Sequence, residues 1–252
     1  MLKGSAFRVT FEKALRNILR MAAGNPGPRT IHKTRKEITK LRSWLRLLRD
    51  DDFPGYHEHS KRLRKCARIL APARDAHVLC ETFEAICNGS GFIKLRKHLK
   101  ERRRKEQRAL ETKIHELKQL LEEELKSVDD FTGVTTMRLL DGLERIREEM
   151  NDAKRSAHVR KSNSALHTWR KRIKNFSHAA ALLDKTPRAA LGEELVQLRG
   201  MLGELHDLLM LYHMLADEIE KHPDLDHAMG HRAAVLLRNV LVPRHLRIDA
   251  RR

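Results

Sequence analysis

Two amphipathic stretches, beginning at His32 and His167 and so 135 residues apart, divide their polar and apolar residues in the same way. At about 100° per residue, each stretch forms a helix with one polar face and one apolar face. The polar faces are His32, Arg35, Lys36, Thr39, Arg42, Ser43 and Arg46, and His167, Arg170, Lys171, Lys174, Ser177 and His178. The apolar faces are Ile38, Leu41, Trp44, Leu45 and Leu48, and Ile173, Phe176, Ala179, Ala180 and Leu183. This repetition predicts two related helices, each with a packed side and a cationic side.

Composition supports an all-α fold and an anionic partner. Only 4% of the 252 residues are aromatic while 40% are hydrophobic, and Leu, Ala, Ile and Val recur at helical spacing. The 52 Lys and Arg against 34 Asp and Glu give a formal net charge of +18, which attracts polyanions. Nucleic acid, an anionic membrane and a phosphate polymer all remain open, because charge alone does not choose among them.

The three cysteines form no Cys-x-x-Cys pair, and residues 1–20 contain no uninterrupted apolar stretch. Reduced thiols are typical of a cytosolic protein, and the N-terminus resembles neither a signal peptide nor a membrane span. We therefore expect a cytoplasmic protein with no membrane-spanning helix and no disulfide.

The whole chain, 1–252, is interpreted as one domain built from an internal repeat. The first repeat covers about 5–88 with helices at 5–22, up to 49, 56–70 and 74–87, the last two separated by Pro72. A long charged helix at about 92–127 connects it to a second repeat at about 132–222, with helices at 134–153, up to 183, 189–201 and 204–221. A C-terminal helix at about 225–247 closes the chain. Asp75 and Asp207 provide a second matched landmark, 132 residues apart.

The cationic faces are the candidate binding site. A further basic stripe on the helix at 56–70 has the i, i+3, i+4, i+7 spacing of one helix face. Guanidinium, ammonium and imidazole groups all suit phosphate oxygens. The predicted phosphate-binding residues are His32, Arg35, Lys36, Lys40, Arg42, Arg46, Lys61, Arg64, Lys65, Arg68, His167, Arg170, Lys171, Lys174 and His178. Two simpler alternatives stay open, namely that the basic stripes are solvated faces and that the two histidines cap or pack near their helix starts.

Metal and catalytic sites are not indicated. Fifteen histidines occur, but no pair such as His57 and His59 has a Cys or carboxylate set at a recognised ligand spacing. Asp75 and Asp207 are expected to hold Arg or Lys side chains in place or to cap their helices, rather than to act as catalysts. We predict no cofactor, no metal and no catalytic residue.

At these residues the chain resembles the CHAD family, whose members carry conserved histidines in an α-helical domain. His32, Arg35, Lys40 and Arg42 match the first copy of the family pattern, and Thr39 departs from it. In the second copy His167, Arg170 and Lys174 match, while Asn175 and Ser177 depart. The Arg74-Asp75 and Leu202-Gly203 to Asp207 segments also resemble the family's.

This resemblance implies two four-helix bundle units related by pseudo-twofold symmetry, with a basic central cavity that binds inorganic polyphosphate. Family members often accompany a triphosphate-tunnel (CYTH) domain, which is missing here, so a standalone binding module is expected. The predicted function is thus non-enzymatic polyphosphate binding in the cytoplasm, with polyphosphate granules as one expected location.

The alternatives are a nucleic-acid-binding, nucleoid-associated protein and a phosphotransferase or phosphatase that uses His32 or His167 as phosphoryl acceptor. Weak nucleic-acid binding is also expected beside the main function. Oligomeric state, chain-length preference and the role of the 92–127 helix stay open.

Overall fold

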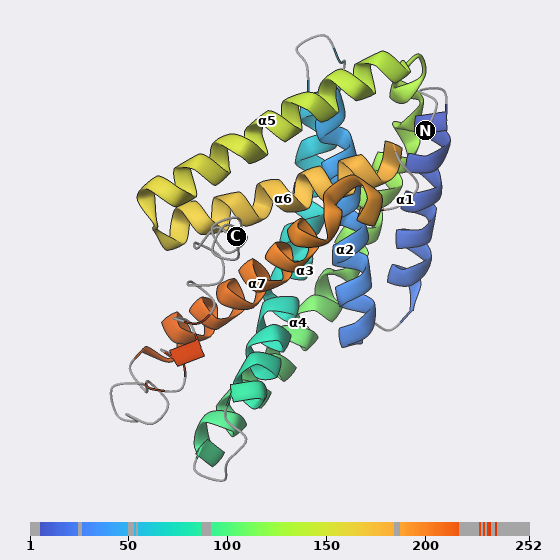
Figure 1. The fold of residues 1–252 in the computed structure, drawn as a ribbon. Helices are drawn as coiled ribbons and strands as arrows, with labels where there is room; N and C mark the ends of the chain where they lie inside the picture. Colours follow the sequence, from blue (N-terminus) through green and yellow to red (C-terminus); the bar gives the residue numbers. More distant parts are fainter. Residues whose placement is uncertain are drawn as a thin grey trace, which may run out of the picture.

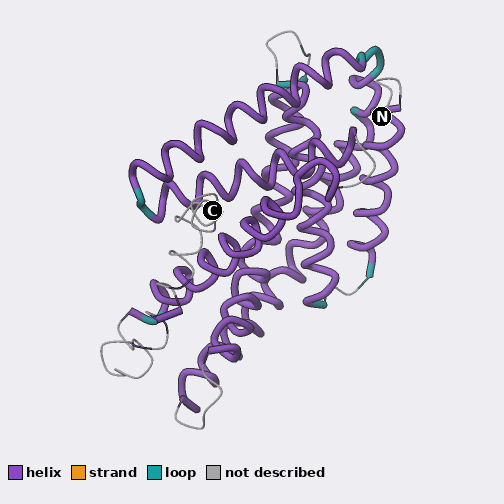
Figure 2. Tube along the Cα trace, viewed as in Figure 1, coloured by secondary structure: helices purple, strands orange, loops and turns teal. Residues whose placement is uncertain are grey.

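The computed structural model describes residues 6–24, 27–49, 53, 55–86, 92–183 and 187–216, together with 227, 229, 231, 232 and 235. Figure 1 shows an assembly of long helices, and no strand occurs in these residues (Figure 2). The all-α prediction is therefore confirmed. The helices are α1 (Phe7–Ala23), α2 (Pro28–Leu45), η2 (Arg46–Leu48), α3 (Tyr56–Ile86), α4 (Ile93–Lys126), η4 (Val128–Phe131), α5 (Thr136–Arg160), α6 (Asn163–Leu183) and α7 (Pro187–Met214).

The two histidine-bearing helices pack in corresponding ways. α2 contacts α1 and α3, whereas α6 contacts α5 and α7. The halves then meet where α2 crosses α6 and where α3 meets α7. His32 lies four residues after the start of α2 and His167 four residues after the start of α6, so both occupy the second turn.

The crossing of α2 and α6 is fixed by buried apolar residues and by polar contacts. Ile38, Leu41 and Ile173 are fully buried, which places the apolar faces inward as predicted. The Trp44 indole N–H donates a 3.0 Å hydrogen bond to the backbone carbonyl of His178. Because the apolar sides point into the core, the polar side of α2 over residues 32–39 and that of α6 over residues 170–178 face a common space.

Two predicted helix breaks are wrong. α3 runs without interruption through Pro72, although an interior proline removes one backbone hydrogen bond and costs about 3 kcal/mol. Leu70 and Ala73 beside Pro72 are buried, and α3 packs against α2, α4 and α7, so tertiary contacts offset that cost. Likewise α7 continues through Gly203, where glycine costs only about 1 kcal/mol.

Each half therefore contributes fewer, longer helices than the four-helix units expected. Within the described residues, 56–86 is one helix instead of two, and 187–214 is one helix instead of two. The long helix predicted at 92–127 is confirmed as α4. Apart from residues 227, 229, 231, 232 and 235, the C-terminal helix predicted at 225–247 lies outside the described residues, as does the end of the helix predicted at 204–221.

A buried ion network fastens the beginning of α3 to the end of α4. Glu124 is fully buried, and its carboxylate contacts His59 Nδ1 at 2.8 Å and accepts a hydrogen bond from Arg62 Nε at 2.7 Å. Nε2 of His59 lies 3.2 Å from the carboxylate of Asp130, and the His59 ring stacks on the Phe131 ring. This network lies away from the polar faces of α2 and α6 and so has a structural role.

No described helix has an apolar run long enough, and sufficiently free of charge, to cross a bilayer.

Candidate anion-binding cavity

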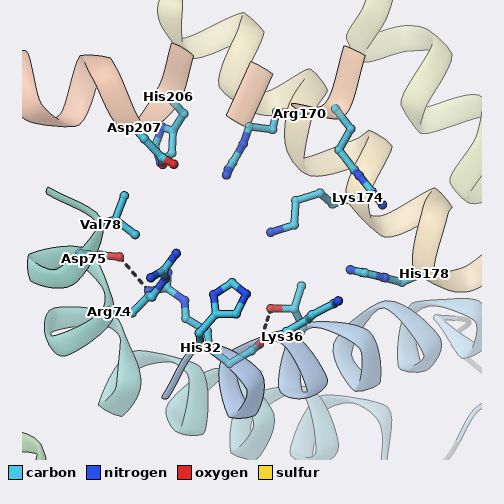
Figure 3. A pocket seen from close by; sticks show the side chains of 13 residues that line it. His32, Lys36, Arg74, Asp75, Val78, Arg170, Lys174, His178, His206 and Asp207 are labelled. Carbon is cyan, nitrogen blue, oxygen red and sulfur yellow. Dashed lines mark hydrogen bonds and ion pairs between the residues drawn. The ribbon is translucent and has the colours of Figure 1, made fainter. Parts of the chain in front are cut away.

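Four helices enclose a polar cavity of about 380 Å³. Figure 3 shows side chains entering it from α2, α3, α6 and α7 on four sides. The lining residues are His32, Arg35, Lys36 and Thr39 from α2; Arg74, Asp75 and Val78 from α3; Arg170, Lys174 and His178 from α6; and Arg199, His206 and Asp207 from α7.

Positive charge predominates in this lining. Six Arg and Lys side chains face two Asp side chains, which leaves four positive charges in excess when the three histidines are neutral. Among the described residues, no carboxylate pairs with Lys36, Arg170 or Lys174. Like charges gathered in a partly enclosed space repel one another, and a bound anion would relieve that repulsion.

Asp75 and Asp207 offset part of the positive charge of the cavity lining. Asp75 Oδ1 accepts a 2.7 Å hydrogen bond from Arg35 Nη1, and this ion pair ties α3 to α2. Burial raises the pKa of the Asp207 carboxyl, while nearby Arg170 and Arg74 oppose that rise. Asp75 therefore positions an arginine, as the sequence predicted, and Asp207 occupies the corresponding place in the other half.

Burial and the neighbouring cations together lower the pKa of Lys174 strongly. Burial, followed by the charges of Arg170 and Arg35, lowers its pKa to about 8. In Figure 3 its amine extends toward the middle of the cavity, opposite Asp75 and Val78. An ammonium held there without an acidic partner is a ready donor to an incoming anion.

The cavity histidines are held in the neutral form by their surroundings. Burial and the charge of Lys174 lower the pKa of His178 to about 3, and burial and the charge of Arg170 lower that of His206 to about 4. Burial and then Arg74 also lower the pKa of His32. Each ring can therefore act as a neutral hydrogen-bond donor, and phosphate oxygens beside it would favour protonation.

Comparison with known proteins agrees with this architecture. The family model described as "CHAD domain" matches residues 6–216, which is most of the chain. The chain belongs to the CHAD domain family. The crystal structure of the CHAD domain from the plant Ricinus communis superposes with a TM-score of 0.70 and 18% sequence identity, covering 98% of this chain and 90% of the plant chain. A search of curated proteins found no match.

In this CHAD domain, six of the fifteen predicted residues line the cavity: His32, Arg35, Lys36, Arg170, Lys174 and His178. The other nine do not: Lys40, Arg42, Arg46, Lys61, Arg64, Lys65, Arg68, His167 and Lys171. Helical spacing predicted a basic stripe longer than the cavity. Only residues between 32 and 39 of α2 and between 74 and 78 of α3 line it.

Several of those nine residues have other partners. Lys40 pairs with Glu37 at 2.6 Å, and Lys65 pairs with Glu116 at 2.8 Å. Arg46 pairs at 2.8 Å with Glu149, which also pairs with Arg49 and Arg172. The ring centroids of His167 and His206 lie 4.4 Å apart, so His167 contacts a residue that lines the cavity without lining it itself.

Sequence reasoning missed Arg74, Val78, Arg199 and His206 as lining residues and did not include Thr39 in the site. A signal for three of them was present. Arg199 precedes His206 by seven residues, which is the spacing of one helix face. Arg74 precedes the matched Asp75, and its guanidinium pairs with Glu81 at 3.3 Å.

Nothing in the described residues is arranged for metal binding. No group of three or more His, Cys, Asp or Glu side chains in that part of the chain is placed to hold a metal ion. Cys66 and Cys80 are buried free thiols, and burial raises the pKa of Cys66 to about 12, so it is an unreactive core residue.

Proposed function

We propose that this CHAD domain is a non-enzymatic module that binds inorganic polyphosphate in the cavity between α2, α3, α6 and α7. The observation that carries the proposal is the excess of positive charge in a partly enclosed space, with Lys36, Arg170 and Lys174 unpaired among the described residues. A linear phosphate chain offers closely spaced oxygens, which can satisfy donors on all four walls at once.

The lining also favours a phosphate chain without bases. Proteins that bind single-stranded nucleic acid stack bases on aromatic side chains. The cavity lining contains histidines but no Phe, Trp or Tyr. A duplex is far too wide for a space of about 380 Å³, so the cavity suits a slender polymer.

Polyphosphate would be held by hydrogen bonds and charge rather than transformed. No cavity side chain in the described structure has the pairing of a nucleophile with a base, because Asp75 is engaged by Arg35 and the histidines lie among cations. We further propose that residues 5–88 and 132–222 are duplicated units related by pseudo-twofold symmetry, so that the cavity is shared between them. Cytoplasmic polyphosphate granules are the expected place of action.

Calorimetric titration with long-chain polyphosphate, beside duplex DNA at matched phosphate concentration, tests the proposal. The Arg35→Glu/Arg170→Glu variant should lose polyphosphate binding, because two donors become repulsive carboxylates. Lys154→Glu on exposed α5 makes the same type of charge change away from the cavity and should bind normally. Equal binding by the cavity variant would contradict the assigned site, and no binding by the unaltered protein would contradict the ligand.

Salt provides a second test. Duplex DNA, by analogy, gives a slope of about −0.9 in log K against log salt for each phosphate neutralised. If about six phosphates are neutralised, log K should fall by about 5 for each tenfold increase in salt concentration. An affinity that is unchanged between low and high salt is incompatible with this mode of binding.

A further inference from the structure

The first half of α4 carries an outward basic face that the cavity does not use. Lys94, Lys97, Lys100, Arg104, Lys105 and Arg108 are all exposed. On the opposite side of the helix, Leu95, Leu99 and Leu110 are buried, and α4 packs against α3 there. The exposed cations are thus fixed on one side of a rigid, packed helix rather than scattered along a tail.

Carboxylates neutralise this face poorly. Between residues 93 and 108, nine Arg and Lys stand against Glu101 and Glu106, an excess of seven positive charges. Glu84 of α3 pairs with Arg96 and, at 3.8 Å, with Lys100. Within the described chain, no acidic side chain pairs with Lys97, Arg104 or Arg108.

Several exposed arginines on other helices have an acidic partner on the same helix. Arg16 pairs with Glu12 on α1, and on α5 Arg147 pairs with Glu144 and Arg155 with Asp152, all at i,i+3 or i,i+4 spacing. In the first half of α4, by contrast, Lys97, Arg104 and Arg108 have no such partner within the described chain. A concentrated charge without local compensation attracts an extended polyanion.

The dimensions of the face fit a DNA groove. Residues 94 to 108 span about 21 Å at about 1.5 Å per residue. Figure 1 shows that the first half of α4, together with the end of α3, extends away from the α5–α6 pair, and the cations of this face are exposed to solvent. The major groove of B-form DNA is about 12 Å wide and admits an α-helix, with phosphates on both walls.

We propose that this face of α4, defined by Lys94, Lys97, Lys100, Arg104, Lys105 and Arg108, is a second binding surface that takes duplex DNA, separately from the cavity. Lys97, Arg104 and Arg108 form the central row of this face, and their long side chains, like those of the flanking cations, reach the phosphates on the two groove walls. Amines and guanidinium groups on this face contact phosphates, so binding is independent of base sequence. The inference stands apart from polyphosphate binding, because the two surfaces share no residue.

Fluorescence anisotropy with a labelled 20-base-pair duplex and the full chain tests it. Lys97→Ala/Arg104→Ala/Arg108→Ala keeps the helix, since Ala favours helix, and removes the central row. We expect at least a tenfold loss of affinity and a salt slope shallower by about 2.7, from about 0.9 per lost phosphate contact. Arg147→Ala/Lys154→Ala/Arg155→Ala on α5 is the matched control and should bind DNA nearly as the unaltered protein does.

The same variants separate this surface from the cavity. Arg35→Glu/Arg170→Glu should keep DNA binding, and the α4 variant should keep polyphosphate binding. The inference is overturned if the α4 variant loses no more affinity than the α5 control, or if the cavity variant loses DNA binding to the same degree. Equal affinity for single-stranded DNA at matched phosphate concentration would overturn the assignment to a duplex.

Discussion

Replacing Lys174 by methionine should stabilise the free protein while weakening its binding of polyphosphate. The Lys174 side chain is partly buried in the cavity wall, and its pKa falls from the ordinary value of 10.5 to about 8 through burial and the charges of Arg170 and Arg35. Its charged form is therefore disfavoured in the folded protein without ligand. Methionine retains a similar length and apolar body without the charge.

The magnitude follows from the two pKa values. A gap between 10.5 and about 8, at about 1.36 kcal/mol per pH unit, corresponds to about 3 kcal/mol of destabilisation when Lys174 is charged. The folded protein releases the Lys174 proton near pH 8 and the unfolded chain near pH 10.5, so between these values the unfolded state binds more protons. The free energy of unfolding of the unaltered protein thus rises through this window.

Thermal unfolding of the two proteins from pH 7 to pH 10 measures the effect. Below pH 8, Lys174→Met should gain about 1–3 kcal/mol, or several degrees in Tm at about 2–4 °C per kcal/mol for a chain of this size. The advantage should shrink as pH rises toward 10. Adding long-chain polyphosphate should raise the Tm of the unaltered protein more than that of the variant. Exposed Lys171→Met on the same helix is the control and should change little.

The reasoning is refuted if Lys174→Met is less stable than the unaltered protein at pH 7, or if its advantage does not depend on pH.

Three further results are expected. Polyphosphate affinity should weaken by up to tenfold per pH unit above pH 8 in isothermal titrations, because Lys174 loses its proton, and the Lys174→Met variant should not show this dependence. Glu124→Ala should cost about 3–5 kcal/mol in urea unfolding, because it leaves His59 and Arg62 without their buried partner; a loss below about 1 kcal/mol would contradict a structural role for the network. Gly142→Ala should cost at least about 1–3 kcal/mol, since its new Cβ would clash with the backbone of Leu47, whereas Gly200→Ala, with open space at that position, should be neutral or stabilising.

Helical periodicity accounts for much of what could be predicted about this fold. The apolar sides of α2 and α6 were predicted from sequence, because residues at helical spacing share one face and that face alone is buried. Pro72 and Gly203 misled the prediction, since their local cost is modest beside the packing of α3 and α7. Local propensity cannot report that packing, because it depends on residues far away in the sequence.

The candidate site was predictable only in part for a related reason. Periodicity places Arg35 and Arg42 on the same side of α2, yet Arg35 enters the cavity and pairs with Asp75 whereas Arg42 does not line it. How far a polar face extends along a cavity depends on where neighbouring helices begin, cross and end. Arg199 of α7 joins the site because α7 packs against α6, and its spacing of seven residues from His206 does not by itself predict that packing.

By itself, the sequence determined the helical class, the apolar sides of the paired helices, the cationic character and the family, because these follow from residue type and spacing along one chain. The tertiary structure alone decided that six of the fifteen predicted residues meet in one cavity, that three further basic or histidine groups and two aspartates come from α3 and α7, and that α4 turns a separate basic face outward. Convergence of charges from distant segments depends on how helices cross. Crossing is fixed by the buried side chains on their opposite faces rather than by the charged residues themselves.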